Sequence, residues 1–149
     1  MRVEKDFKEF IALLNKLDVR YLIIGGFAYS FYVEPRYTKD IDILISQSEK
    51  NVHKILQVLQ NFGFEDIDLT EKDFFEPEQV IQLGIDPVRI DILTSIKNME
   101  FPNLWKNRVI GHYGDIQVNF ISKKDLIKSK QRSGRMQDLA DIEKLEKMP

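Results

Sequence analysis

Ile23-Ile24-Gly25-Gly26-Phe27-Ala28 and, after a short gap, Arg36-Tyr37-Thr38-Lys39-Asp40-Ile41-Asp42-Ile43 decide the fold that this sequence predicts. In the first segment a glycine pair ends an apolar run. Glycines after a strand let backbone N–H groups approach an anion, and the N-terminus of a following helix adds positive potential. In the second segment Asp40 and Asp42 stand one residue apart within another apolar run. With Asp91 in a third apolar run, the sequence predicts a phosphate cradle beside three carboxylates at one end of a small sheet.

Length and composition limit the class of protein. The chain has 149 residues, 43% of them hydrophobic and 31% charged, which fits one globular domain with a real core. A net charge of −2 means that no overall positive field attracts nucleic acid, although the sequence still allows a local basic patch. The absence of cysteine excludes disulfides and thiolate metal sites, and two histidines, His53 and His112, argue against a histidine-rich zinc site. We see no signal peptide and no membrane-spanning segment, so we expect a cytoplasmic protein.

Hydrophobic periodicity predicts helices and strands in a mixed order. We expect helices over residues 4–17, 27–32, 49–62, 123–133 and 136–147, a helical turn over 101–106, strands over 19–24 and 40–45, two hairpins over 80–93 and 108–121, and a short strand followed by a loop over 64–73. In the last helix we expect Leu139, Ile142 and Leu145 to face inward. This order is not a regular βαβ alternation. It predicts an α+β domain, with a mixed sheet flanked by helices and a C-terminal helical hairpin.

The aspartates are the candidates for chemistry. Asp40 and Asp42 alternate with isoleucines, so both carboxylates lie on one face of one strand. Two carboxylates so close repel each other unless a cation intervenes, and an oxygen-only ligand set favours Mg²⁺ or Mn²⁺. The alternative is a solvated sheet face on which both aspartates pair with Lys or Arg. Asp91 lies on the non-core face of its own strand, and it joins the other two if the strands are neighbours; Asp86, in Gly-Ile-Asp-Pro, fits a turn instead.

These motifs resemble a known superfamily. Gly25-Gly26, a gap of thirteen residues, Asp40-Ile41-Asp42 and a later Ile90-Asp91-Ile92 are similar to the nucleotidyltransferases with the polymerase-β-type fold. The segment 35–42 resembles the small bacterial and archaeal members, which are related to the minimal nucleotidyltransferases, the abortive-infection toxins and the antibiotic nucleotidyltransferases. The tail over residues 130–142 is similar to the Lys…Gly-Arg…Asp…Asp pattern that closes many of them. The resemblance implies one nucleotidyltransferase-like domain over residues 1–149.

The resemblance also implies roles for single residues. Gly25 and Gly26 would hold the triphosphate of a nucleotide, and Asp40 and Asp42 would bind Mg²⁺ or Mn²⁺. Asp91 would complete the metal site and help to deprotonate the acceptor hydroxyl. The implied reaction is attack of an acceptor oxygen on the α-phosphorus of a nucleoside triphosphate, with pyrophosphate leaving. Many relatives carry Gly-Ser where this chain has Gly-Gly, so a serine hydroxyl that could contact a phosphate is missing.

Several cations could stand near the phosphates. The candidates are Arg36, Lys39, Lys130 and Arg135, and the resemblance places a helix lysine near the nucleotide at Lys130. Alternatively, Arg36 and Lys39 pair with neighbouring acids, and Lys130 belongs to a solvated basic helix face. We expect Asp138 and Asp141 to cap and brace the last helix. The aromatic residues of segment 27–32 fit core packing, whereas Tyr37 is the aromatic residue that stays open for base stacking.

Three readings of the whole sequence remain at this point. The first is a Mg²⁺-dependent nucleotidyltransferase that uses ATP or another nucleoside triphosphate, with a small molecule, a tRNA end or a protein hydroxyl as acceptor. The acceptor could bind at a homodimer interface. The second is a non-catalytic nucleotide-binding or partner-binding module, such as one half of a toxin–antitoxin pair. The third, an unrelated domain with incidental aspartates, requires the glycine pair, Asp40, Asp42 and Asp91 to coincide by chance.

Overall fold

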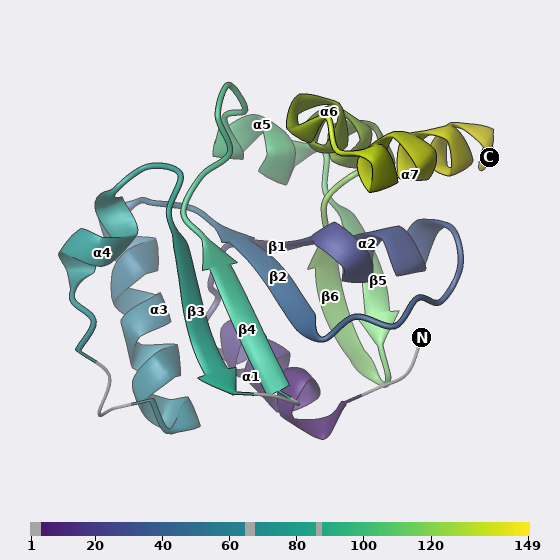
Figure 1. The fold of residues 1–149 in the computed structure, drawn as a ribbon. Helices are drawn as coiled ribbons and strands as arrows, with labels where there is room; N and C mark the ends of the chain where they lie inside the picture. The colour runs from purple at the N-terminus through teal and green to yellow at the C-terminus, as the bar shows by residue number, and fades with distance from the viewer. Residues whose placement is uncertain (1–3, 65–67, 86–87) are drawn as a thin grey trace.

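The fold is a six-stranded mixed sheet with seven helices around it (Figure 1). The computed structural model describes residues 4–64, 68–85 and 88–149. The helices are α1 (Lys5–Lys16), α2 (Gly25–Tyr32), α3 (Glu49–Phe62), α4 (Glu71–Phe75), α5 (Phe101–Lys106), α6 (Lys123–Ser133) and α7 (Met136–Lys147). The strands are β1 (Tyr21–Ile24), β2 (Asp40–Ile45), β3 (Val80–Ile85), β4 (Val88–Leu93), β5 (Val109–Tyr113) and β6 (Ile116–Phe120). This confirms the predicted α+β class.

The strand order is β3-β4-β2-β1-β6-β5. The pairs β1–β2, β3–β4 and β5–β6 are antiparallel, whereas β2–β4 and β1–β6 are parallel. Both predicted hairpins are therefore present, although the 86–87 turn of the first lies outside the described residues. Helix α1 packs against α3, and α2 packs against β1, β2, α6 and α7. The helices α6 and α7 form the expected C-terminal hairpin, which lies beside α2 (Figure 1).

Side chains alternate between the two faces of the sheet along β2 and β4, and this separates the core residues from the predicted site residues. Ile41 and Ile43 on β2, and Ile90 and Ile92 on β4, are all at most 1% exposed. Because side chains on a strand alternate between faces, the residues between these isoleucines emerge on the other side of the sheet. Burial of such side chains stabilises the fold by about 1.5–3 kcal/mol each. The isoleucines thus fix the strand register, and the register in turn fixes where the aspartates point.

Capping residues explain where helix α3 begins and ends. The Ser48 hydroxyl accepts a hydrogen bond from the backbone N–H of Asn51, which satisfies one of the unpaired donors at the start of α3. Gly63 then ends the helix with a φ of 110°, a left-handed conformation that glycine adopts without strain. Helix α6 begins in the same way, since Ser122 accepts from the backbone N–H of Asp125.

The structure corrects two expectations. The segment over residues 64–73 is not a strand followed by a loop in its described part, because Thr70 and Asp73 form a capping box that starts α4. Leu139 does not face inward but is 53% exposed, whereas Ile142 and Leu145 are buried as expected. None of the described helices has the length and apolar content that a bilayer span requires.

Candidate active site

The parallel pairing of β2 with β4 brings the three predicted carboxylates together. Asp42 stands directly opposite Asp91, and Asp40 stands opposite Arg89. All four side chains are on the sheet face opposite to the buried isoleucines. Asp91 is only 8% exposed, although a carboxylate on a simple solvated sheet face would be open to water. The condition set by the sequence, that the two strands be neighbours, is met.

The electrostatics of this cluster are those of like charges crowded together. Burial, followed by the negative charges of Asp91 and Asp40, raises the pKa of Asp42 from 3.8 to about 7. Burial and the charge of Asp40 also raise the pKa of Asp91. One oxygen of Asp40 and one of Asp91, both Oδ1, are buried without a hydrogen-bond partner in the described part of the protein. Buried oxygens of this kind are costly unless a cation or a donor reaches them.

The glycine pair lies directly against this cluster. Gly25 is the first residue of α2 and has a φ of +68°, a left-handed conformation. A Cβ atom at this position would lie 2.2 Å from Asp42 Oδ2, and a Cβ atom on Gly26 would lie 2.4 Å from the Thr38 methyl carbon. Only glycine therefore lets the turn between β1 and α2 approach the carboxylate so closely. The predicted phosphate cradle and the predicted metal ligands are neighbours.

The carboxylate oxygens of Asp40, Asp42 and Asp91 suit a hard divalent cation, although the three side chains do not form a ready coordination shell in this structure. Among the described residues, no three His, Asp or Glu side chains are arranged as a ready metal-binding group. The fit rests instead on the two unpartnered carboxylate oxygens and on the cross-strand pairing of Asp42 with Asp91. Carboxylates alone favour Mg²⁺ or Mn²⁺.

Two of the predicted cations are held by the last helix. The Arg36 guanidinium donates to both carboxylate oxygens of Asp141, at 3.0 and 2.5 Å, and stacks 3.8 Å from the centre of the Tyr29 ring. Lys130 Nζ lies 3.0 Å from Asp141 and 3.4 Å from Asp138. Burial opposes ionisation of Asp141, but the hydrogen bonds from Arg36 and Lys130 outweigh it and hold the pKa below its usual value. Asp138 and Asp141 thus brace α7 as expected, but they do not cap it, because its N-cap is Arg135 and no side-chain cap hydrogen bond is present there.

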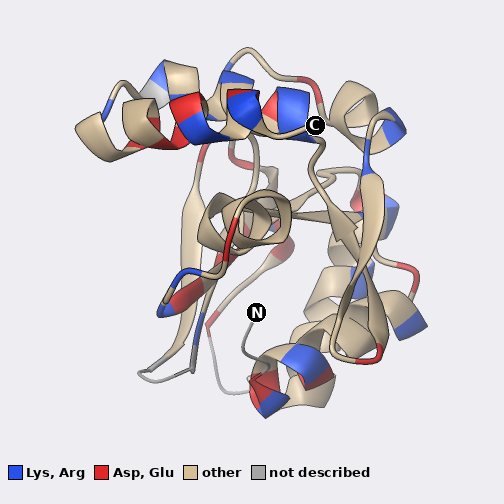
Figure 2. Cartoon of the chain, turned by 90° about the vertical axis from the view of Figure 1, so that its right-hand side faces the viewer, with Lys and Arg blue, Asp and Glu red and all other residues tan. Residues whose placement is uncertain are grey.

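The other two predicted cations are more exposed. Arg135, at the junction of α6 and α7, donates from Nε to Asp138 at 2.8 Å. Its pKa is raised chiefly by this hydrogen bond and also by the negative charge of Asp42. The junction therefore lies close enough to the carboxylate cluster to feel its field. Figure 2 shows where basic and acidic residues lie along α6 and α7. Lys39, next to Asp40, is exposed, and so is Tyr37.

Reasoning from the sequence missed Arg89 and the role of Tyr29. Arg89 Nε lies 3.7 Å from Asp40 Oδ1 and 3.8 Å from Asp91 Oδ1. Strand alternation could have found it, because a residue two positions before Asp91 must share its face. Tyr29 was expected to serve only in core packing. It is buried, but its ring also supports Arg36, a contact between distant segments that has no local sequence signal.

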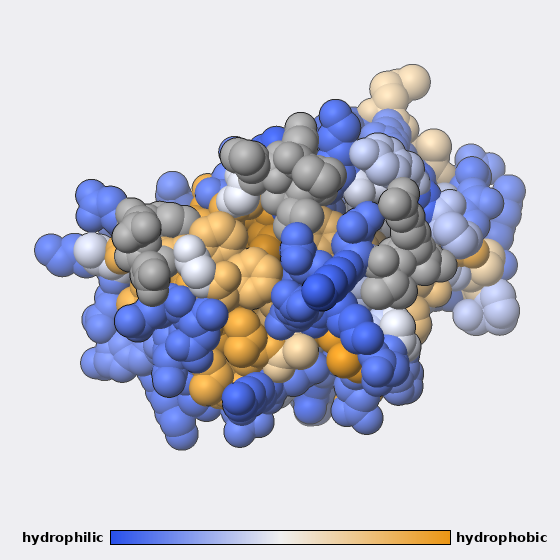
Figure 3. Space-filling view, turned by 90° about the horizontal axis from the view of Figure 1, so that it is seen from below, coloured by the Kyte–Doolittle hydropathy of each residue, from blue (hydrophilic) through white to orange (hydrophobic). Residues whose placement is uncertain are grey.

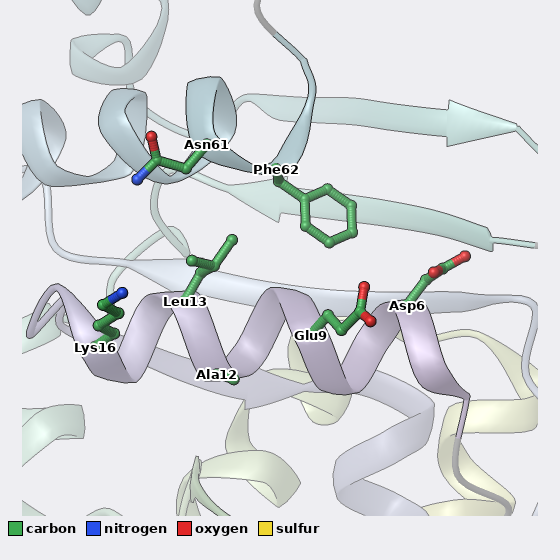
Figure 4. Close-up of a pocket in the computed structure, with 7 residues that line it drawn as sticks. All are labelled: Asp6, Glu9, Ala12, Leu13, Lys16, Asn61 and Phe62. Atoms are coloured by element: carbon green, nitrogen blue, oxygen red, sulfur yellow. The ribbon is translucent and has the colours of Figure 1, made fainter.

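A groove on the surface lies away from these residues. Seen from below, where α1 and the end of α3 lie in Figure 1, the surface carries an apolar patch framed by hydrophilic side chains (Figure 3). A groove of about 560 Å³ runs between α1 and α3 (Figure 4). It is lined by Asp6, Glu9, Ala12, Leu13, Lys16, Asn61 and Phe62. None of these is a predicted site residue, so the groove does not enter the function proposed below.

Comparison with known proteins agrees with this fold. Lincosamide antibiotic adenylyltransferase LnuA, solved with lincomycin bound, is 17% identical with a TM-score of 0.60, over 97% of this chain and 96% of that one. A candidate nucleotidyltransferase from Thermotoga maritima is 16% identical with a TM-score of 0.62, over 93% and 88%. An antigenic nucleotidyltransferase-like protein from Paracoccidioides brasiliensis is 15% identical with a TM-score of 0.57, over 94% and 74%.

At these identities the similarity establishes the fold. A search of curated proteins found no significant match. The nucleotidyltransferase fold that the motifs predicted agrees with the fold of these structures, which align with nearly the whole chain. The model of the family described as Nucleotidyltransferase of unknown function (DUF6036) matches residues 1–147, and the chain belongs to this family.

Proposed function

We propose that the protein is a Mg²⁺- or Mn²⁺-dependent nucleotidyltransferase that transfers a nucleoside monophosphate, with ATP as the donor, to a hydroxyl group of an acceptor. The family description and the fold support nucleotidyl transfer in general. The observation that carries the proposal is the cross-strand pairing of Asp42 with Asp91, with Asp40 on the same face and Gly25 against Asp42. An unrelated domain with incidental aspartates would not need this convergence.

Asp40, Asp42 and Asp91 would hold the metal. When bound, a divalent cation neutralises the carboxylates and draws negative charge from the reacting phosphates. The two unpartnered oxygens, Asp40 Oδ1 and Asp91 Oδ1, are the first candidates for its ligands. Burial, followed by the negative charges of Asp91 and Asp40, raises the pKa of Asp42 to about 7, and this crowding of carboxylates favours binding of either a proton or a cation.

The turn at Gly25-Gly26 would hold the triphosphate. Its backbone N–H groups are at the start of α2, an eight-residue helix whose N-terminus carries positive potential. Lys39 and Arg135 are the exposed cations near the carboxylates that could contact the phosphates. Lys130 and Arg36 are held by Asp141, so we assign them the second task of adding positive charge near the phosphates without direct contact.

Asp91 would receive the proton of the acceptor hydroxyl as its oxygen attacks the α-phosphorus. Its side chain is 11% exposed against 31% for Asp40, and burial raises its pKa. A carboxylate with a raised pKa is a stronger base, which suits it to this task. The bond that forms joins the acceptor oxygen to the α-phosphorus, and the bond that breaks releases pyrophosphate.

Calorimetric titration with ATP tests the proposal. We expect the wild-type protein to bind ATP with Mg²⁺ and to lose most of this affinity with EDTA, and we expect the Asp40→Asn/Asp42→Asn variant to show no Mg²⁺-dependent binding. Metal-independent binding of equal strength in both proteins would favour the second reading, a nucleotide-binding module without catalysis. The absence of any binding to a folded wild-type protein would reject the nucleotide site and favour a partner-binding module, such as a component of a toxin–antitoxin pair.

A further inference from the structure

Arg89 is the cation that the fold places inside the carboxylate cluster. It stands opposite Asp40 on the neighbouring strand and two residues before Asp91 on its own strand. Its Nε atom lies 3.7 Å from Asp40 Oδ1 and 3.8 Å from Asp91 Oδ1. One nitrogen is therefore nearly equidistant from two of the three proposed metal ligands.

The two oxygens that Arg89 approaches are the two unpartnered ones. Asp40 Oδ1 and Asp91 Oδ1 are buried and, within the described residues, accept no hydrogen bond. Distances of 3.7 and 3.8 Å are within ion-pair range but too long for hydrogen bonds. The guanidinium therefore supplies charge to these oxygens without occupying their lone pairs. A metal ion would need the same oxygens and the same space between them.

Arg89 is also free to move away. Its side chain is 35% exposed, and its neighbour on the other side, on β3, is Gly84, which has no side chain to hold it in place. The cations of the last helix differ in this respect. Arg36 is fixed by two hydrogen bonds to Asp141, and Arg135 is bonded to Asp138. A loosely held cation on the ligand oxygens behaves as a counter-ion that a stronger cation can displace.

We propose that Arg89 is a built-in counter-ion of the metal site, which offsets the repulsion between Asp40 and Asp91 before the metal binds, competes with the metal and leaves the ligand oxygens when it arrives. This inference rests on the proposed metal site. It has a functional consequence, because the penalty for displacing Arg89 is smallest when a triphosphate is present to pair with the released guanidinium. The site would therefore take up its metal together with the nucleotide and bind the metal alone only weakly.

The size of the competition follows from the contacts. A cationic neighbour within about 4–6 Å lowers the proton affinity of a carboxylate by roughly 10- to 1,000-fold, and the same field acts on a divalent ion. Because Arg89 is a third exposed and forms no hydrogen bond to the two oxygens, we take the low end of this range. We expect Arg89→Gln to bind Mn²⁺ about tenfold more tightly than the wild type in the absence of nucleotide.

Titration with Mn²⁺, followed by the electron paramagnetic resonance of the free ion, measures this affinity without a turnover assay. Arg89→Lys keeps the charge and should stay close to the wild type. Arg20→Gln is the matched control, since it removes the same charge from an exposed position five residues before Gly25, about 16 Å away along β1. ATP should strengthen Mn²⁺ binding more in the wild type than in Arg89→Gln, because binding couplings are reciprocal.

The metal-free proteins give a second readout. In EDTA, Arg89→Gln should melt at a lower temperature than the wild type, because the carboxylates lose their counter-ion, and saturating Mn²⁺ should remove the difference. Equal or weaker Mn²⁺ binding by Arg89→Gln overturns the inference while leaving the proposed function intact. Undiminished Mn²⁺ binding by Asp42→Asn overturns the metal site itself, and with it both proposals.

Discussion

The contact between Gly25 and Asp42 offers a sharp test, because one added methyl group separates two effects. Gly25 has a φ of +68°, and a Cβ atom there would lie 2.2 Å from Asp42 Oδ2. Gly134, which ends α6, has nearly the same φ, +66°, but a Cβ atom there would meet nothing within 4 Å. Gly25→Ala and Gly134→Ala therefore share the backbone strain, and only Gly25→Ala also pushes on the carboxylate.

The magnitudes follow from these two geometries. A left-handed conformation costs a residue with a Cβ about 1–2 kcal/mol, so Gly134→Ala should lose stability by about this amount and Gly25→Ala by at least as much. Ordinary contact begins at 3.4 Å, so Asp42 Oδ2 must move by about 1.2 Å or the turn must retreat by as much. A displacement of about 1 Å at a reacting centre can reduce the rate by about 100-fold. We therefore expect Gly25→Ala to lose metal-dependent nucleotide binding far beyond its loss of stability.

Urea unfolding and calorimetric titration with Mg²⁺ and ATP, made on the same preparations, compare the two losses. We expect Gly25→Ala to lose at least as much unfolding free energy as Gly134→Ala, because the clash with Asp42 adds to the shared backbone strain, and we expect Gly134→Ala to keep the nucleotide affinity of the wild type. The reasoning is refuted if folded Gly25→Ala binds Mg²⁺ and ATP as tightly as Gly134→Ala does. That result would mean that the turn and Asp42 do not act on the same ligand.

Three further variants test the charges around the site. In the metal-free protein the pKa of Asp42 is about 7 against an ordinary 3.8, so the folded state keeps a proton that the unfolded state has lost between about pH 4 and 7. Stability should fall over this window by up to about 4 kcal/mol, whereas Asp42→Asn should remove most of the slope and leave the part that comes from the raised pKa of Asp91; a flat wild-type profile in EDTA contradicts this. Lys130→Met should lose about 1–3 kcal/mol of unfolding free energy, because it removes charged hydrogen bonds to Asp138 and Asp141, and it should weaken ATP binding but not Mn²⁺ binding. Unchanged ATP affinity would remove Lys130 from the phosphate site. Asp141→Asn should cost about 1.5–3 kcal/mol in urea unfolding, because Arg36 and Lys130 both lose a carboxylate acceptor; an unchanged midpoint would show that the network does not stabilise α7.

Local signals made much of the fold predictable. The bounds of α3 follow from Ser48 and Gly63, and β2 follows from strict alternation, so both were predicted to the residue. Helix α4 was missed because it has only five residues and its capping box uses Asp73 rather than Glu. Leu139 was misplaced because apolar period alone does not define the inner face of α7. Asp138 and Asp141 also face inward there, paired with cations from other segments.

The candidate site was predictable only in outline. The aspartates and glycines were recognisable as a pattern, but their convergence depended on the pairing of β2 with β4, which are not consecutive strands. Arg89 was missed because the sequence analysis searched for acidic residues. Strand alternation places it on the same face as Asp91, but its contact with the site is recognisable only once the strand pairing sets Asp40 opposite it. The ion pair between Arg36 and Asp141 joins residues more than a hundred positions apart, and only tertiary structure reveals it.

The central claim, that one metal and one nucleotide share the carboxylate and glycine site, is tested most directly by a crystal structure with Mn²⁺ and a non-hydrolysable ATP analogue. The account predicts an anomalous peak about 2.0–2.2 Å from carboxylate oxygens of Asp40, Asp42 and Asp91, with the triphosphate against Gly25-Gly26. A nucleotide bound in the groove between α1 and α3, or Mn²⁺ that avoids the three aspartates, would contradict it.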